Sequence, residues 1–479
     1  MKTHEYHKLP SRVLDLGPPE GDEEPRLVET AGYPEGNWAA LSHCWGGPQH
    51  HPLKTTRKNL SRHMNGIPIS SLPKTFLDAI IITKTLRLRY LWIDSLCIIQ
   101  DDENDWLAES KNMGVLYERA VITLAASSAP NSTHGLFLER PYYDLEIPSV
   151  QLPFVRKDAI NGVQELLGHY SVGIEWRQEP FMTQIDPVAT LLSTRGWATQ
   201  EWILSRRTVH FTYQGMVWVC QRCAEDETGK RIIGRGLPEA DWTPEWGRII
   251  QEHSHRDFTY ERDRLVSLEA MAREIGKTKT YKDTYCFGMW MSDVPEHLLW
   301  SPLVRGKRRT ICPSWSWPSS HGPVWFRFRS FDSGRQDETL MSCCKVLEVD
   351  EKGGTLIISA KKVEIQHFLL KKMEKTEKTD QAGSWYRTPL HEGYSIGLPN
   401  DPPSGWVEFD DGLDVDGSEP IFFLHLATID YWIDPKLEQY GILIVRDPVQ
   451  EEVYNRVGIG TTWDPSWMED ASKVSTRII

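Results

Sequence analysis

Several side chains that could take part in catalysis follow the apolar run Tyr90–Ile93. Asp94, Cys97 and Asp101 occur within eight residues of one another. If the apolar run is a strand of a parallel sheet, these side chains emerge at its carboxyl end, where open α/β sheets bind their ligands. They are therefore candidate catalytic residues, although Asp94 could also serve only to cap the following turn.

Two other apolar runs are followed by polar groups in the same way. Ser42 and His43 come directly after residues 38–41, and Ser127 follows residues 121–125. His43 could act as a general acid or base because the ordinary pKa of histidine lies near neutrality. Its neighbour Cys44 would point to the opposite face of an extended strand, so Cys97 is the better thiol partner for His43.

Cleavage of a glycosidic bond is one reaction that these residue types could support. Its transition state resembles an oxocarbenium ion and is stabilised by a nearby carboxylate, here Asp94, Asp101 or Glu109. Aromatic walls that bind a flat base and exclude water would come from Trp45 or Trp106.

The elements that must position these residues form an alternating pattern. Strands are predicted at residues 38–41, 90–93 and 121–125. A helix from Ser70 or Ser71 to Leu86 and another at about Asp105–Glu118 separate them. The sequence therefore predicts an α/β fold with an N-terminal βαβαβ parallel-sheet unit, in which the 90–93 strand is central and the three polar clusters converge at one edge.

The rest of the chain is predicted to be less regular and richer in strands. Further strands are expected at 150–155, 170–176, 207–212, 216–220, 313–318, 355–363, 421–428 and 440–445, further helices at 193–207, 246–253 and 262–275, and a charged loop at 371–380. We divide the chain into an arm (1–37) with one strand expected near Ser11–Leu16, a domain at 38–207 whose α/β core is 38–130, a Trp-rich α+β region (208–330) and a β-rich C-terminal region (331–479).

Composition narrows the class of protein. The net charge of −13 over 479 residues argues against non-specific binding to nucleic acid. No apolar stretch approaches the roughly 18 residues of a membrane span, and no secretory leader is evident, so a cytoplasmic protein with reduced thiols is expected. The spacing of Cys220 and Cys223 suits zinc, but no second ligand pair completes a set, and we predict no metal.

Taken together, five spaced segments resemble the heterokaryon incompatibility (HET) domain family of filamentous fungi. They are Ala40–Gly46, Leu72–Ala79, Tyr90–Asp101, Asp105–Trp106 with Met113 and Tyr117, and Arg195–Glu201 with Leu204–Ser205. The resemblance covers roughly residues 38–207, and Pro313–Trp317 looks like a block found downstream in such proteins.

The resemblance implies a cytosolic fungal protein that acts in non-self recognition and programmed cell death, with a protein partner in signalling. It also implies a distant similarity to TIR and flavodoxin-like folds, and some TIR domains cleave NAD. Glu109 is the best positional counterpart of the helix-borne glutamate of such enzymes. NAD is thus a possible substrate, and no cofactor is required.

Two other functions remain open. The strand-end cleft could bind a small molecule, a nucleotide or a protein segment without turnover, using Ser42, Trp45, Trp106, Ser127, Arg195 and Glu201. Arg195 would also suit a structural ion pair with Asp94 or Glu201. Alternatively, a Trp-lined pocket could serve a cofactor-free cyclase or dehydratase of fungal secondary metabolism, although Trp197, Trp315 and Trp317 are better explained as core.

Overall fold

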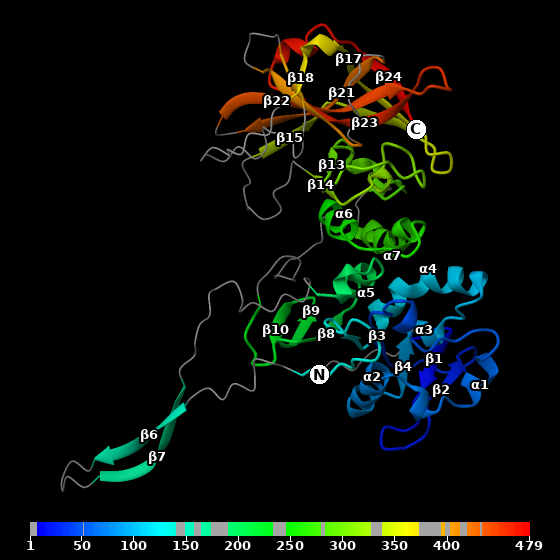
Figure 1. Cartoon of the computed structure of the whole chain (residues 1–479), viewed down its shortest axis with the longest axis vertical. Helices are drawn as coiled ribbons and strands as arrows, with labels where there is room; N and C mark the ends of the chain where they lie inside the picture. The colour runs from blue at the N-terminus through cyan, green and yellow to red at the C-terminus, as the bar shows by residue number, and fades with distance from the viewer. Residues whose placement is uncertain are drawn as a thin grey trace. The chain divides into compact units, whose positions relative to one another are not determined.

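The structure is a computed structural model that describes residues 7–50, 52–139, 149–157, 164–173, 190–232, 246–278, 283–326, 338–372, 394–397, 403–411, 419–431 and 434–479. The chain forms two compact units, one made of Met1–Ser193 and Glu201–Trp242, the other of Thr194–Gln200 and Thr243–Ile479 (Figure 1). The chain therefore enters the second unit for seven residues and returns to the first before leaving it again.

An eight-stranded mixed sheet forms the centre of the first unit, in the order β10-β9-β8-β5-β3-β4-β1-β2. The strands are β1 (Arg12–Asp15), β2 (Arg26–Glu29), β3 (Trp38–Ser42), β4 (Tyr90–Ile93), β5 (Ile122–Ala125), β8 (Arg207–Thr212), β9 (Gly215–Cys220) and β10 (Cys223–Asp226). The four inner strands β4, β3, β5 and β8 run parallel, and the outer strands pair antiparallel. All residues of β3 and β5 are buried, as expected for strands covered on both faces.

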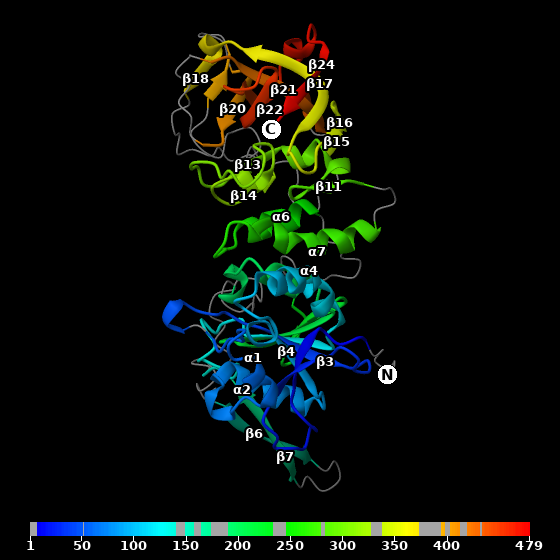
Figure 2. The same cartoon turned by 90° about the vertical axis from the view of Figure 1, so that its right-hand side faces the viewer.

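Helices α2 (Lys74–Thr85) and α4 (Glu103–Arg119) connect β3 to β4 and β4 to β5. They lie on opposite faces of the sheet (Figure 2), as right-handed crossovers require when β4 and β5 flank β3 on opposite sides. Phe76 of α2 and Tyr117 of α4 are buried. Asp102 caps α4 by accepting from the N–H groups of Asn104 and Asp105. The predicted βαβαβ unit is confirmed.

Two features of this sheet differ from the prediction. Among the three predicted strands, β3 lies between β4 and β5, so β4 is not the central strand of the unit. The N-terminal segment, expected to be an arm with one strand near Ser11–Leu16, contributes that strand as β1 and also an unpredicted strand, β2. β1 pairs with β4 through Leu14 and Asp15. The remaining helices are α1 (Leu60–Asn65), the single turn α3 (Asp94–Cys97) and α5 (Ala198–Ile203), which is shorter than the predicted helix at 193–207.

The strands predicted at 150–155, 207–212 and 216–220 are present, whereas the strand predicted at 170–176 begins earlier, at Gln164, and its last three residues lie outside the described residues. β6 (Ser149–Lys157) pairs with β7 (Gln164–Gly173), and β8 pairs with β9 around Gly215. Short 3-10 helices occupy Pro48–His50, Ile69–Ser71, Leu192–Thr194, Met291–Asp293, Glu296–Leu298, Trp317–Ser319, His367–Leu369 and Pro465–Met468.

The second unit combines two helices with a strand-rich region. Its elements are α6 (Trp246–Ser254), α7 (Asp263–Thr278), β11 (Tyr285–Cys286), β12 (Met289–Trp290), β13 (Trp300–Pro302), β14 (Val324–Phe326), β15 (Glu338–Ser342), β16 (Lys345–Val349), β17 (Leu356–Ile365), β18 (Leu370–Lys372), β19 (Tyr394–Ile396), β20 (Gly405–Phe409), β21 (Ile421–Tyr431), β22 (Asp434–Arg446), β23 (Val453–Thr462) and β24 (Lys473–Ile478). The strands from β15 onward form a ten-stranded sheet, which confirms the β-rich C-terminal region. Its pairings close into a ring through β17, β21, β22, β23 and β24.

The predicted strand at 313–318 is wrong. Pro313–Ser316 forms a turn and Trp317–Ser319 a 3-10 helix. Both indoles are nevertheless core, with Trp315 and Trp317 no more than 1% exposed. Their N–H groups donate to the carbonyls of Gly354 (2.9 Å) and Gly288 (3.2 Å), which satisfies the one polar group of each ring. Of the predicted charged loop, residues 373–380 lie outside the described residues, and Leu370–Lys372 form β18.

Candidate functional site

Asp94 lies at the carboxyl end of β4, in the first turn of α3, and is 7% exposed. Its Oδ1 accepts the backbone N–H of Ser95 at 2.7 Å, and its Oδ2 accepts the indole N–H of Trp45 at 2.9 Å. The Nδ1 atom of His43 lies 3.8 Å from Oδ1, close enough for a charge interaction when the imidazole is protonated. A buried carboxylate thus lies beside a histidine where two parallel strands end.

Ser42 and His43 extend this cluster from the end of β3. The Ser42 hydroxyl donates to Oε2 of Glu201, and both residues are buried. The ring of His43 packs edge-on against Phe76 of α2, with 5.1 Å between ring centroids. We call Ser42, His43, Trp45, Asp94 and Glu201 the strand-end group. All five were predicted as site residues.

The end of β5 lies against the loop that follows β3. The N–H of Ala126 donates to the carbonyl of Ser42 at 2.9 Å. Gly46 has φ +80°, and a Cβ added there would lie 2.6 Å from Cβ of Asn131, so glycine is required at this close approach of the two loops.

Ser127, the candidate from β5, contacts a histidine that the sequence did not single out. Its hydroxyl lies 2.9 Å from Nδ1 of His210, which is on β8. Burial lowers the pKa of His210 to about 4, so its imidazole is neutral at physiological pH. The parallel pairing of β5 with β8 brings the two together, and the single histidine in the apolar run 207–212 was the only sequence signal for it.

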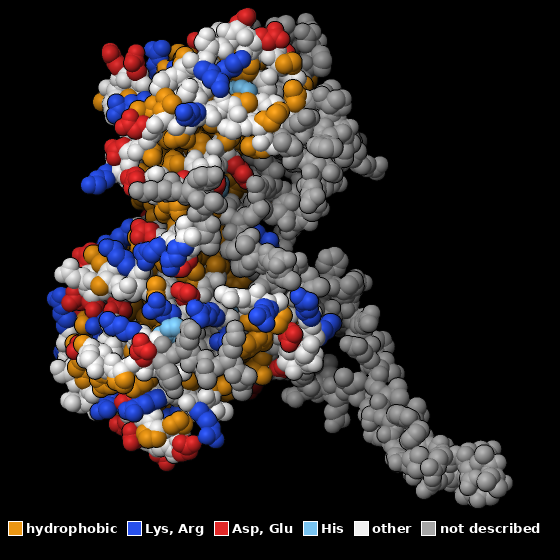
Figure 3. All heavy atoms as spheres, turned by 180° about the vertical axis from the view of Figure 1, so that it is seen from behind, with side chains coloured by type: hydrophobic (Ala, Val, Ile, Leu, Met, Phe, Trp, Pro, Cys, Tyr) orange, Lys and Arg blue, Asp and Glu red, His pale blue; other side chains and the backbone are white. Residues whose placement is uncertain are grey.

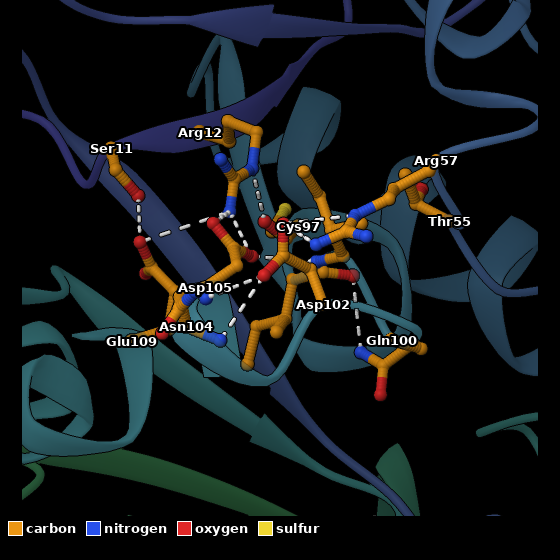
Figure 4. A network of polar contacts seen from close by, with 12 residues as sticks. Ser11, Arg12, Thr55, Arg57, Cys97, Gln100, Asp102, Asn104, Asp105 and Glu109 are labelled. Atoms are coloured by element: carbon orange, nitrogen blue, oxygen red, sulfur yellow. Dashed lines mark hydrogen bonds and ion pairs between the residues drawn. The ribbon is translucent and has the colours of Figure 1, made fainter. Parts of the chain in front are cut away.

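Glu109 belongs to a different cluster, built on α4 and β1 (Figure 4). Its Oε1 accepts from the Ser11 hydroxyl and lies 3.8 Å from Nη2 of Arg12. Arg12 also binds both carboxylate oxygens of Asp105, at 2.6 and 2.5 Å, and donates from Nε to the carbonyl of Cys97 at 2.7 Å. Burial raises the pKa of Glu109, whereas the hydrogen bond from Ser11 and the charge of Arg12 oppose that rise. We call these residues the Arg12 cluster.

Asp101 and Trp106 flank the start of α4. Asp101 is exposed, and its Oδ1 accepts the backbone N–H of Arg57 at 2.8 Å. Its neighbour Asp102 is ion-paired with the Arg57 guanidinium at 2.9 Å. Trp106 is half-buried in the first turn of the helix. The contacts of Asp101 therefore fasten the loop before α4, and they do not involve the strand-end group.

Arg195 belongs to the second unit, where its backbone forms an isolated parallel β-bridge with Asp257. Its pairing with Asp94 or Glu201 stays a prediction. Trp197, from the same segment, donates its indole N–H to Asp263 of α7 at 3.3 Å.

Cys97, the last residue of α3, is fully buried, with 0% exposure. Burial raises the pKa of its thiol to about 12, so the nucleophilic thiolate is scarce at neutral pH.

We expect Cys97 to resist alkylation by iodoacetamide in the native protein at pH 7.5 and to react fully in urea. Both the burial of its sulfur and the raised pKa slow the native reaction. Peptide mass spectrometry at timed intervals measures this. Rapid native labelling, within the time that an unfolded thiol needs, would contradict the burial of Cys97 and restore it as a nucleophile.

The described residues offer neither a grouped set of metal ligands nor a surface of a single charge on the face seen in Figure 3. In the part of the chain that the structure describes, no three His, Cys, Asp or Glu side chains are grouped as metal ligands. Basic and acidic side chains are intermixed over the described surface on the face shown in Figure 3. Among the described residues, no helix combines the length and apolarity needed to cross a membrane.

The fold and the strand-end group together define an α/β unit with a cluster of polar groups at the carboxyl edge of its parallel strands. Residues 38–201 match the family described as Heterokaryon incompatibility protein (HET). This segment, about a third of the chain, is therefore similar to the HET family. No curated protein and no solved structure matches the chain.

Proposed function

We propose that this protein acts in fungal heterokaryon incompatibility by triggering programmed cell death, and that its strand-end group binds and cleaves a nucleotide such as NAD. The observation that carries the proposal is the buried Asp94 carboxylate, held by Trp45 and Ser95 beside the His43 imidazole. Such a pair of titratable groups, fixed where parallel strands end, is the usual setting of an α/β active site.

In the proposed reaction the bond between the ribose C1′ and the nicotinamide nitrogen breaks, and its electron pair leaves with neutral nicotinamide. The Asp94 carboxylate stabilises the positive charge that develops on the ribose. A water molecule then attacks C1′, His43 accepts one of its protons and passes it to solvent, and ADP-ribose remains. Trp45 orients Asp94 through its N–H, and Glu201 with Ser42 offers polar groups to the ribose hydroxyls.

The direct test is to incubate purified protein with NAD and to measure the nicotinamide released. Asp94→Asn keeps the size of the side chain but removes its charge, so we expect turnover to fall by about 10²-fold or more. Asp15→Asn is a matched control, because Asp15, on β1, is also a buried carboxylate and accepts a hydrogen bond from Nε of Arg89 at 2.7 Å. It should keep its turnover per folded molecule.

Two outcomes would overturn cleavage of NAD: no nicotinamide from the unaltered protein where an established NADase works, or full turnover in folded Asp94→Asn. Cell death on expression in a fungal host is measured in parallel. Loss of both readouts in Asp94→Asn alone supports the proposal.

A second candidate is a signalling module that binds its ligand without turnover. The specific observation in its favour is that Asp94 already accepts two hydrogen bonds and Glu201 accepts one from Ser42. Groups that satisfy each other in this way can hold the fold together as well as catalyse. This candidate predicts that death persists in folded Asp94→Asn and that no nicotinamide is released.

A further inference from the structure

Cys220 and Cys223 lie at the end of the β9–β10 hairpin, away from the residues that the proposed function uses. They face each other as partners in the antiparallel register, on either side of the two-residue turn Gln221–Arg222. Their Sγ atoms are 3.7 Å apart. Both cysteines are half-buried, whereas the two turn residues are exposed, so small reagents in solvent can reach the pair.

The two thiols differ in their surroundings. Burial raises the pKa of Cys220, but the N–H groups of Arg222 and Cys223 and the thiol of Cys223 donate toward its sulfur and bring its pKa below the ordinary value. Burial and the neighbouring Cys220 raise the pKa of Cys223 to about 11. One sulfur is therefore favoured as the thiolate and the other as the thiol, the division of roles in an attacking and resolving pair.

Four other cysteines have a raised thiol pKa, in contrast to the lowered pKa of Cys220. Burial raises the pKa of Cys97, Cys286 and Cys312 to about 12 and that of Cys344 to about 11. A structural metal is a weaker explanation for the pair, since zinc takes four ligands and the described residues hold no third His, Cys, Asp or Glu grouped with it.

We propose that Cys220 and Cys223 form a redox-active dithiol, which a hydroperoxide oxidises to a reversible intramolecular disulfide. The Cys220 thiolate attacks the O–O bond of hydrogen peroxide, giving a sulfenic acid and hydroxide. The Cys223 thiol then displaces the sulfenic oxygen as water, and the S–S bond forms. The two thiols lose two electrons and the peroxide gains them. Reduction by an external thiol restores the pair.

The consequence for the fold is local. β10 is the edge strand of the eight-stranded sheet, and it pairs with β9 through Cys223–Cys220 to Asp226–Val217. A disulfide at the turn would fasten this edge hairpin covalently. The redox state of this pair would thereby record the exposure of the first unit to oxidants.

The test uses the full-length protein, treated with hydrogen peroxide, alkylated, and digested with trypsin. Because trypsin cleaves after Arg222, the oxidised pair should appear as a disulfide joining peptides 208–222 and 223–230. Dithiothreitol should return both peptides to the alkylated form. We also expect native Cys220 to react with iodoacetamide at neutral pH at least about tenfold faster than Cys312, a half-buried thiol that serves as the internal control.

Variants separate the two roles. In Cys223→Ser, peroxide should leave a sulfenic acid on Cys220 that dimedone traps, whereas Cys220→Ser should give no trapped product at Cys223. The proposal is overturned if no linked peptide forms at peroxide concentrations that spare Cys97, or if Cys220 and Cys312 react equally fast. Stoichiometric retention of zinc by the purified protein, with the thiols protected from peroxide, would replace it with a metal site.

Discussion

Replacement of Arg456 by methionine should lower the free energy of unfolding of the second unit by about 3–5 kcal/mol. Arg456, on β23, is a fully buried cation with 0% exposure. Its guanidinium binds Asp410 at 3.1 and 3.3 Å and donates to the carbonyls of Leu298 (2.8 Å) and Trp300 (2.5 Å). It also lies 3.4 Å from the centroid of the Trp300 ring.

The expected loss arises from the groups left behind. Methionine fills much of the volume but leaves two buried carbonyls without the guanidinium donor. Asp410 would keep its ion pair with Arg308, at 2.8 Å. Burial lowers the pKa of Arg456 to about 10 and Asp410 opposes that change, so the side chain is charged at neutral pH.

Denaturant unfolding, followed by tryptophan fluorescence, measures this difference. Arg477→Met is the matched control, because Arg477 is an exposed arginine on the neighbouring strand β24 and should lose far less. A loss below about 1 kcal/mol in Arg456→Met would mean that Arg308 suffices for Asp410 and that the fully buried arginine is dispensable.

Replacement of Arg12 by methionine should destabilise the first unit by a similar amount, about 3–5 kcal/mol. Arg12 is 7% exposed and neutralises two carboxylates at once, Asp105 and Glu109. It also ties β1 to the carbonyl of Cys97 in α3. Without it, the carboxylates face each other across a buried cluster whose charge is uncompensated.

The loss should depend on pH in a defined direction. Burial already raises the pKa of Glu109, and loss of the Arg12 charge raises it further. A carboxyl group whose pKa is higher in the folded state opposes folding when ionised, and this penalty disappears as it takes up a proton. The deficit of Arg12→Met relative to the unaltered protein should therefore shrink as pH falls from 7 toward the ordinary value of 4.5.

Parallel unfolding curves at several pH values test this expectation. Arg57→Met is the control, since Arg57 forms an exposed ion pair with Asp102 near the same helix terminus and should have little effect at any pH. A deficit that stays constant from pH 7 to 5 would show that Glu109 does not gain a proton in the variant, and that packing of the Arg12 stem accounts for the loss.

The sequence was sufficient for the central βαβαβ unit because its signals are local. Apolar runs at 38–41, 90–93 and 121–125, each separated by a helical repeat, determine both the strand type and the edge where polar groups collect. The alternation of Trp and Ser at 314–317 led to the wrong prediction of a strand. A turn followed by a 3-10 helix buries both indoles and gives the same short sequence pattern.

Contacts between distant segments could not be predicted in this way. Glu109 lies near Arg12 only because β1, a four-residue strand in a segment rich in Pro, Gly and acids, adds to the sheet beside β4. In the same way, the hydrogen bond from Trp45 to Asp94 depends on the path of the loop after β3. Residue types identified the candidates, but only the packing separates the strand-end group from the Arg12 cluster.

The division of the chain between the two units limits which fragments of this protein can fold by themselves. A fragment ending at Glu201, where the family match ends, would contain Thr194–Gln200 without the unit they belong to. It would also lack β8, which pairs with β5 from Thr123 to Ala125. The open edge of β5 would then be free to pair with other chains and promote aggregation. A fragment that keeps the eight-stranded sheet of the first unit whole should therefore extend through β8, β9 and β10 to Trp242.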